Sequence, residues 1–189
     1  MLEMSIGLNL VLIVVVLALL YQLHLAKRRI GHDRRTEVNW FWHVAPKMAQ
    51  LAKRASRGGR PIAGAMLDID GFKQVNDTYG HQRGDRVLRE LCQVILEAIR
   101  PLDILTRYGG EEFFLIFILD DGVEGALGAA EKVRGAIESH VFDGDLRLTV
   151  SIGVAICPMD GLTLDDLVKR ADDAVYAAKR QGKNRVVLA

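Results

Sequence analysis

The apolar positions divide the chain into two unequal parts. Residues 4–25 contain no acidic residue and no Lys or Arg, and positions 10–20 show no polar face. A bilayer core is crossed by ~20 mostly apolar helical residues, so residues 1–26 are predicted to form a transmembrane anchor. A buried core helix would show a polar face, and a cleaved signal peptide would begin with basic residues. Here the basic residues follow the apolar segment, from Lys27 onward.

The charges after the apolar segment predict the orientation of the anchor. Basic residues concentrate on the cytoplasmic side of membrane spans, so everything after Lys27 is expected in the cytoplasm. The same residues can contact anionic membrane lipid. Residues 27–39 are mostly polar and are predicted to form a juxtamembrane linker. Its basic residues near the span are Lys27, Arg28, Arg29, Arg34 and Arg35.

The rest of the chain alternates between helical and strand-like patterns. Trp40, Val44 and Met48 recur at helical spacing, and Pro46 either kinks this helix or marks its start. Gly109-Gly110 lies between two apolar runs and predicts a tight hairpin. The predicted elements are helix 40–56, strand 62–69, a short helix after Asp70, helix 84–99, strands 104–108 and 113–119, helix 122–139, strand 146–156, helix 163–180 and strand 184–188.

This order of elements predicts an α+β sandwich with a mainly antiparallel central sheet and helices packed around it. The formal net charge is +1, so the composition does not indicate a nucleic acid polymer as partner. Cys92 and Cys157 lie far apart without CxxC spacing, so they form neither a disulfide framework nor a zinc site.

Acidic residues stand where two neighbouring strands are predicted to end. Asp68 and Asp70 close strand 62–69, and alternation predicts that both point to one side and converge on one cation. Glu111 and Glu112 follow the Gly-Gly hairpin. Carboxylates suit Mg²⁺, and the Ile69 carbonyl can complete the ligand set. A single strand-end acid is more often merely solvated, but the combination with the hairpin favours a metal site.

Phosphate-binding groups are predicted beside these acids. The turn Gly71-Phe72-Lys73 leads into a short helix, and backbone N–H groups at such a turn form an anion cradle. Lys179 and Lys183 are four residues apart, so they are predicted on one helix face, where they can neutralise a triphosphate. A solvated helix end whose cations complement the helix dipole is the alternative.

Ordered motifs across residues 33–189 resemble the GGDEF-domain diguanylate cyclases. The motifs are Asp68-Ile-Asp-x-Phe-Lys-x-x-Asn76-Asp, Gly80-His-x-x-Gly-Asp85, Arg107-Tyr-Gly-Gly-Glu-Glu-Phe113 and Ala171-Asp-x-Ala-x-Tyr-x-Ala-Lys179-x-x-Gly-Lys-Asn-Arg185. The resemblance implies a fold similar to the polymerase palm and to nucleotide cyclases, with residues 40–189 forming the GGDEF catalytic domain.

The resemblance also implies a role for each matching residue. Asp68, the Ile69 carbonyl and Glu111 would bind two Mg²⁺ or Mn²⁺ ions per GTP site, and Glu112 would support them. Guanine would be read by Asn76 and Asp85, because a carboxylate accepts hydrogen bonds from donors that adenine lacks. Phosphates would be held by the backbone amides of Phe72 and Lys73 and by Lys179 and Lys183. Family members often carry Arg in place of Lys183, and Lys lacks the bidentate fork of Arg.

The implied reaction joins two GTP molecules into cyclic di-GMP with release of pyrophosphate. The 3′-hydroxyl of one GTP attacks the α-phosphate of the other, and metal ions assist. Each protomer holds one GTP, so a homodimer is expected. With the anchor, the implied location is the bacterial inner membrane, single-pass, with the catalytic domain in the cytoplasm.

Two further segments relate to regulation. Arg100-Pro-Leu-Asp103 matches the RxxD motif at which product inhibits the family, and a surface salt bridge at the helix end is the alternative reading. The family's opening motif, DxLTGLxNR, survives only as fragments in Asp33-Arg-Arg-Thr36-Glu-Val38-Asn39-Trp. This departure concerns how the linker docks rather than the metal chemistry.

Two other functions are compatible with part of the motif set. A non-enzymatic receptor would bind cyclic di-GMP through Arg100 and Asp103, but it would be free to lose Asp68, Glu111 and Glu112. A haloacid-dehalogenase-type phosphatase shares a DxD motif, but gives the Gly-Gly-Glu-Glu hairpin no role.

Overall fold

The computed structural model describes residues 31–33, 35–55, 57, 60–120, 122–157 and 163–189. A compact unit runs from Asp33 to Ala189. The domain therefore begins earlier than the predicted boundary at residue 40, because Asp33 and Thr36 are already buried. The predicted anchor at residues 1–26 lies outside the described ranges. Within those ranges no helix has the length and apolar character needed to cross a bilayer.

The core of the unit is a mixed sheet of six strands in the order β1-β3-β4-β2-β5-β6. The pairs β3–β4, β4–β2 and β2–β5 are antiparallel, and the edge pairs β1–β3 and β5–β6 are parallel. The predicted α+β class with a mainly antiparallel sheet is confirmed. The sequence did not predict that the two edge pairs are parallel. The strands are β1 (Asn39–Trp40), β2 (Ile62–Ile69), β3 (Ile104–Arg107), β4 (Glu112–Ile118), β5 (Val150–Cys157) and β6 (Arg185–Leu188).

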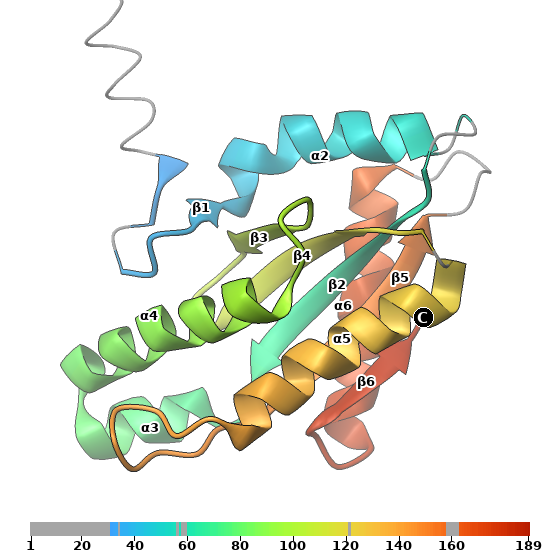
Figure 1. Cartoon of the computed structure of the whole chain (residues 1–189). Helices are drawn as coiled ribbons and strands as arrows, with labels where there is room; N and C mark the ends of the chain where they lie inside the picture. Colours follow the sequence, from blue (N-terminus) through green and yellow to red (C-terminus); the bar gives the residue numbers. More distant parts are fainter. Residues whose placement is uncertain (1–30, 34, 56, 58–59, 121, 158–162) are drawn as a thin grey trace, which may run out of the picture. The chain divides into compact units, whose positions relative to one another are not determined.

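Helices cover both faces of the sheet. In Figure 1, α4 and α5 lie on one face, and α2 and α6 lie on the other. The α3 helix stands beyond the end of β2 and leads directly into α4. The helices are α2 (Phe41–Ala55), α3 (Phe72–Tyr79), α4 (His81–Ala98), α5 (Gly122–Ser139) and α6 (Leu164–Arg180).

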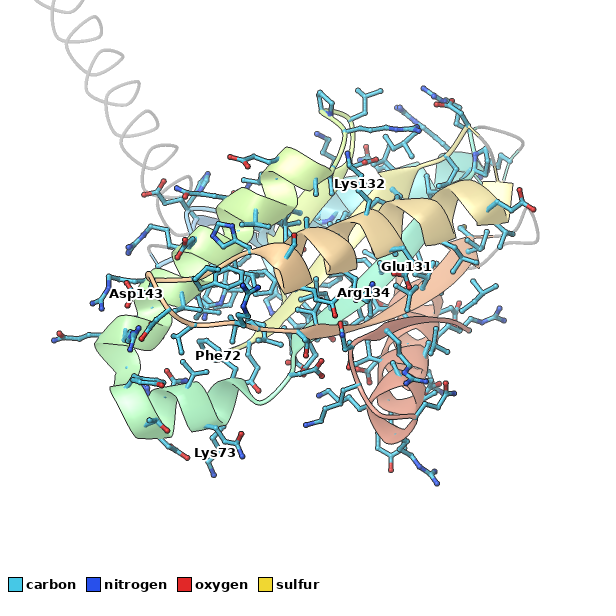
Figure 2. The ribbon with its side chains drawn as sticks, turned by 60° about the horizontal axis from the view of Figure 1, so that its bottom comes forward. Phe72, Lys73, Glu131, Lys132, Arg134 and Asp143 are labelled. Carbon is cyan, nitrogen blue, oxygen red and sulfur yellow. The ribbon has the colours of Figure 1, made fainter. Side chains whose placement is uncertain are left out.

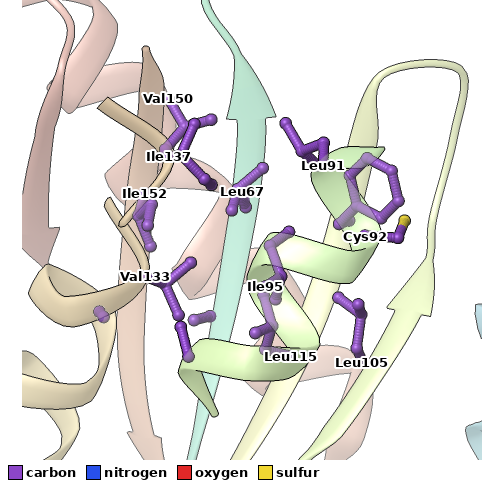
Figure 3. Packing of buried hydrophobic residues seen from close by; sticks show 14 of the residues in the cluster. Leu67, Leu91, Cys92, Ile95, Leu105, Leu115, Val133, Ile137, Val150 and Ile152 are labelled. Atoms are coloured by element: carbon purple, nitrogen blue, oxygen red, sulfur yellow. The ribbon is translucent and has the colours of Figure 1, made fainter. Parts of the chain in front are cut away.

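The central strand β2 is buried on both faces along its whole length. Leu67 faces a cluster that includes Leu91 and Ile95 of α4 and Val133 of α5 (Figure 3). Each such side chain contributes ~1.5–3 kcal/mol when it is fully removed from water. Cys92 is buried in the same layer and shows no disulfide. The end of β2 is therefore fixed firmly by packing on both sides.

The α6 helix lies unusually close to the sheet because glycine stands beneath it. A Cβ atom on Gly153 of β5 would lie 2.0 Å from the carbonyl oxygen of Ala171 and 2.4 Å from the nitrogen of Val175. Glycine inside a strand often marks such a close backbone approach. The height of α6 above the strand ends is set by this contact.

Most predicted boundaries agree with the structure. Strand 62–69 and helix 122–139 are confirmed, and Thr163 caps α6 in a capping box with Asp166. Pro46 lies inside α2, which is continuous from Phe41 to Ala55. The strand predicted at 146–156 begins later, at Val150, because Leu146 instead forms an isolated bridge with Phe142.

Candidate active site

Two acidic side chains meet where β2 and β4 end. Asp68 is directly opposite Glu112 in the antiparallel register of these strands. Residues directly opposite each other project from the same face of a sheet, so both carboxylates stand on the face covered by α6. The side chain of Asp68 is only 9% exposed. Glu111 comes next to this pair because the N–H of Ile69 donates to its carbonyl oxygen at 3.3 Å.

Lys179 of α6 forms an ion pair with Asp68. Its Nζ lies 2.7 Å from Asp68 Oδ2, and its side chain is 38% exposed. The close seating of α6 on Gly153 brings the end of this helix within reach of the strand end. Lys179 therefore lies beside the strand-end acids, and its predicted contact with phosphate stays a prediction.

The carboxylates of Asp68, Glu111 and Glu112 carry more negative charge than the nearby Lys179 neutralises. Burial raises the pKa of Asp68, and this effect outweighs the contribution of Lys179. Burial and the negative charge of Asp68 likewise raise the pKa values of Glu111 and Glu112. Mutual repulsion between partly desolvated carboxylates is relieved by a bound cation.

The donor set fits a hard divalent cation. Within the described ranges, no group of three or more His, Cys, Asp or Glu side chains is assembled in a metal-holding geometry. The expected set is smaller, with the carboxylates of Asp68 and Glu111 and the carbonyl of Ile69. One or two carboxylates with remaining positions left to phosphate and water is the coordination that Mg²⁺ commonly takes.

Asp70 does not join this set, so the predicted convergence of Asp68 and Asp70 on one cation is wrong. Its carboxylate accepts hydrogen bonds from Thr149 Oγ1 and Ser151 Oγ, both at 2.7 Å, and from the N–H of Asn184 at 3.1 Å. Both of its oxygens are therefore used by neighbouring elements. Asp70 holds the end of β2 in place.

The hairpin between β3 and β4 is held by a buried arginine. Arg107 Nε donates to the carbonyl of Gly109 at 3.0 Å, and its Nη2 donates to the carbonyl of Gly110 at 2.5 Å. Its Nη1 pairs with the buried carboxylate of Asp33. Asp33 also accepts hydrogen bonds from the N–H and the hydroxyl of Thr36, at 3.2 and 2.7 Å.

The fragments Asp33 and Thr36 of the expected opening motif thus dock on the hairpin itself. A Cβ atom on Gly109 at the tip would lie 2.3 Å from Glu112 Oε2, so a larger residue there would force the Glu112 carboxylate to move. Glycine makes room for the carboxylate that faces Asp68. Sequence reasoning missed Arg107 and Gly153 as contributors to the site, although a glycine inside an apolar strand is a recognisable signal for Gly153.

The turn after β2 presents backbone donors. Gly71 has φ of 75°, and no described side chain caps the α3 helix that follows it. The first N–H groups of a helix have no partner within the helix, so those of Phe72 and Lys73 are available to an anion. The ring of Phe72 is buried, which fixes this turn against the core (Figure 2).

Lys183 does not share a helix face with Lys179, so this part of the prediction is wrong. The α6 helix ends at Arg180, and Lys183 lies in the turn beyond it with φ of 64°. Its N–H donates to the carbonyl of Ala178 at 3.0 Å, and its side chain is exposed. The helix stops here because Gly182 takes φ of 112°.

The predicted guanine-reading residues come together between α3 and α4. A Cβ atom on Gly84 would lie 2.0 Å from Asn76 Oδ1, so Asn76 fills the space that glycine leaves beside Asp85. The Asp85 carboxylate lies 3.4 Å from Arg35 Nη1 in an exposed ion pair. Exposed pairs contribute ~0–1 kcal/mol, so a ligand can displace Arg35 easily.

The predicted product site lies at the far end of α4. Asp103 accepts hydrogen bonds from the N–H groups of Arg100 and Ile118 at 2.9 and 3.0 Å. Arg100 Nη1 lies 3.3 Å from Asp120 Oδ2, and its side chain is 62% exposed. Asp103 therefore shapes the turn, and Arg100 is the member that faces solvent.

Strand-end carboxylates beside an uncapped helix N-terminus are typical of domains that bind a nucleotide together with a divalent cation. A family model described as diguanylate cyclase, GGDEF domain, matches residues 30–185. The response regulator PleD of Caulobacter vibrioides is 40% identical over 161 residues, which cover 82% of this chain and 34% of that protein. Diguanylate cyclase A of Treponema denticola is 42% identical over 126 residues, which cover 65% of this chain and 34% of that protein.

The chain belongs to the GGDEF diguanylate cyclase family. It spans about a third of the length of these curated relatives. A crystal structure of the coiled coil and GGDEF domain of DgcB from Caulobacter crescentus, in complex with c-di-GMP, is similar with a TM-score of 0.82. The two chains are 33% identical, with 92% of this chain and 93% of that chain covered.

Proposed function

We propose that this chain is a diguanylate cyclase that condenses two GTP molecules into cyclic di-GMP and pyrophosphate. The observation that carries the proposal is the placement of Asp68 opposite Glu112, with Glu111 beside them, at the strand ends next to the α3 turn. The relatives point the same way, since one of them is named diguanylate cyclase A. A receptor that only binds cyclic di-GMP is the alternative outcome of the test below.

The metal ligands in this proposal are Asp68, Glu111 and the Ile69 carbonyl, with Glu112 as supporting carboxylate. Two Mg²⁺ or Mn²⁺ ions per site, when bound, supply Lewis acidity toward the attacking hydroxyl and the α-phosphate. The protein holds its carboxylates in place before substrate arrives, through the strand register and the Arg107 contacts. Groups placed in advance need little rearrangement during the reaction.

The triphosphate is proposed to lie between the α3 turn and the end of α6. The N–H groups of Phe72 and Lys73 act as backbone donors, and Lys179 supplies a positive charge. Lys183 adds a second charge from the turn beyond the helix. Lys179 also pairs with Asp68 at 2.7 Å. We expect cation binding at Asp68 to release Lys179 toward phosphate.

Guanine specificity is assigned to Asn76 and Asp85. A carboxylate accepts the N1–H and amino donors of guanine, and adenine does not offer this pair. Arg35 is displaced from Asp85 in this scheme, at small cost for an exposed ion pair.

A homodimer is part of the proposal. One site holds one GTP, and the cyclic product contains two equivalent linkages, so two protomers present their substrates to each other. The cyclic product is further proposed to restrain the enzyme through Arg100, with Asp103 shaping the turn. Arginine suits this role because its guanidinium contacts phosphate in a bidentate manner.

We further propose that residues 1–26 anchor the domain to the inner membrane, with residues 27–39 leading to it. The apolar run and the basic residues from Lys27 onward support this. Recovery of the full chain in the membrane fraction, resistant to alkaline carbonate extraction, is the expected result. Release by carbonate would contradict the anchor.

The activity is tested with the full chain in detergent, GTP and Mg²⁺, and separation of products by chromatography with mass detection. We expect cyclic di-GMP and pyrophosphate from GTP, and no cyclic product from ATP. Glu111→Gln keeps the size of the side chain and removes a charge, so it should abolish product without loss of folding. Undiminished turnover in Glu111→Gln, or binding of cyclic di-GMP without any turnover by the wild type, would overturn the proposal.

A further inference from the structure

The turn that carries Lys183 has an unusual backbone conformation. Gly182, Lys183 and Asn184 all have positive φ, at 112°, 64° and 45°. The left-handed region is unfavourable for residues other than glycine, although asparagine tolerates it better than lysine does. Two consecutive residues of this kind persist only where their surroundings hold them. Contacts from outside the turn must therefore stabilise it.

Asn184 makes those contacts with its N–H and with both ends of its side-chain amide. Its N–H donates to Asp70 Oδ2 at 3.1 Å, and its Nδ2 donates to Glu138 Oε1 at 2.7 Å. Its Oδ1 accepts a hydrogen bond from Arg134 Nη1 at 2.8 Å. Two of the three partners come from α5, a helix about fifty residues earlier in the chain.

The guanidinium of Arg134 is also held by side chains of its own helix, α5. Its Nε donates to Glu131 Oε2 at 2.7 Å, and its Nη1 donates to Glu138 Oε2 at 2.8 Å. Its side chain is 19% exposed. Figure 2 shows Glu131 and Arg134 next to each other on α5. Glu131 and Glu138 of α5 therefore orient the guanidinium of Arg134, whose planar arrangement of N–H donors can bond several acceptors at once.

The other end of the connection is the metal-binding strand. Asp70 receives the Asn184 N–H and also accepts hydrogen bonds from Thr149 and Ser151. Asp70 follows Asp68 by two residues, at the end of β2. A continuous series of hydrogen bonds thus runs from α5, through the turn after α6, to the strand end that holds Asp68.

We propose that Arg134 is a positioning residue for the triphosphate site. It fixes Asn184, and through Asn184 it fixes the neighbouring Lys183 in the left-handed turn after α6, which is bonded to Asp70 at the end of β2. Arg134 itself does not contact substrate in this scheme. The inference rests on the proposed function only where it assigns phosphate binding to Lys183. The connection between Arg134 and the turn stands on the contacts alone.

The connection is tested first without nucleotide, by hydrogen exchange of the full chain in detergent. The amides of Lys183 and Asn184 are both hydrogen-bonded, so they exchange slowly in the wild type. We expect Arg134→Ala to accelerate exchange in peptides covering 182–185, and Arg170→Ala, an exposed cation on α6, to leave it unchanged. Unchanged exchange in Arg134→Ala, with a cooperatively folded protein, overturns the proposal whether or not the chain is an enzyme.

The role in catalysis is tested by steady-state kinetics with GTP. Loss of a hydrogen bond to a charged group predicts a ~10-fold rise in KM for Arg134→Ala, with a smaller change in kcat. Asn184→Gly tolerates the backbone conformation but removes the side-chain contacts, so it should raise KM similarly. The double variant should be no worse than either single variant, because both interrupt one connection.

Partial recovery of KM in Arg134→Lys, which restores a cation without the fork, is also expected. Additive effects in the double variant, or a loss of kcat at unchanged KM, would overturn the positioning role. If the wild type makes no cyclic product but exchange responds as expected, the proposed function fails while the connection from Arg134 to Lys183 is supported. The two failures are therefore distinguishable.

Discussion

Arg107 and Asp33 form a buried ion pair that joins the segment before α2 to the hairpin between β3 and β4. Their side chains are 3% and 7% exposed. The same guanidinium holds the carbonyl groups of Gly109 and Gly110. The hairpin geometry therefore depends on a residue far away in the sequence, at the start of the compact unit.

Removal of the arginine is predicted to destabilise the protein strongly. Arg107→Ala leaves the Asp33 carboxylate buried without its partner, which typically costs ~3–5 kcal/mol in the free energy of unfolding. Urea denaturation of wild type, Arg107→Ala, Asp33→Ala and the double variant measures the coupling. A double variant that loses the full sum of the single losses would contradict a direct interaction.

Asp33 also predicts how stability depends on pH. Burial acts to raise the pKa of Asp33, but hydrogen bonds from Thr36 and Arg107 outweigh it, so the pKa lies below the ordinary value of 3.8. A lowered pKa in the folded state adds stability above the unfolded value, and this stability is lost as pH falls through the folded value. The wild type should therefore lose stability more steeply than Asp33→Asn as pH falls below about 3.8. The measurement is the urea midpoint of both proteins as a function of pH. Equal losses of the midpoint with falling pH in wild type and Asp33→Asn would contradict this prediction.

Glu37 is predicted to be a removable source of strain. It has φ of 62°, at the position where the DxLTGLxNR pattern has glycine. Glu37→Gly should raise the free energy of unfolding by ~0.5–1 kcal/mol, because glycine adopts this conformation freely and part of the gain is lost to chain entropy. Glu37→Ala keeps the strain and serves as control. Equal stabilisation by both variants, measured by thermal denaturation, would assign the effect to the side chain instead.

The seating of α6 on β5 predicts an effect on catalysis. Gly153→Ala places a methyl group against the backbone of Ala171 and Val175. The helix must shift, which moves Lys179 away from Asp68, so we expect lower stability and at least ~10-fold lower kcat/KM, as a small misplacement commonly produces. Gly135→Ala of α5, where nothing lies within 4 Å of the new atom, is the matched control. If Gly153→Ala is destabilised but keeps a normal kcat/KM, the packing of α6 on β5 does not control the position of Lys179.

Divalent cations are predicted to stabilise the protein through the strand-end carboxylates. Burial raises the pKa values of Asp68 and Glu111, which disfavours their charged forms, and a bound cation would favour those forms. Ligand at 100 times its Kd adds ~2.7 kcal/mol, so Mg²⁺ should raise Tm. Asp68→Asn should abolish the shift, and Asp173→Asn, an exposed acid on α6, should retain it. The same shift in Asp68→Asn would place the cation elsewhere.

The sequence predicted the helices and strands well where the periodicity of apolar residues agreed with the residues that begin and end these elements. Strand 62–69 is mostly apolar with Asp68 next to its end, and helix 122–139 has an apolar stripe. The start of β5 was missed because Leu146 fits an alternating pattern but pairs locally with Phe142. Alternation along one strand cannot reveal that kind of short loop closure.

The sequence predicted the positions of the strand-end acids better than their contacts. Asp68 lies opposite Glu112 as expected, because short-range motifs place both residues at strand ends. Their assigned roles stay predictions. Asp70 was misassigned, since its hydrogen-bonding partners come from β5 and from the turn after α6. Contacts between distant segments, such as Arg107 with Asp33, leave no local pattern in the chain.

The burial of the two cysteines has a practical consequence for studying this protein. Burial raises the pKa of Cys92 to about 12 and also raises that of Cys157. Alkylating reagents attack the thiolate, so the native thiols should stay unmodified at neutral pH. A cysteine introduced on the surface near the hairpin can then carry a fluorophore or spin label selectively. Pairs of such labels would test the proposed dimer by reporting the separation between two copies, without prior removal of the natural sulfurs.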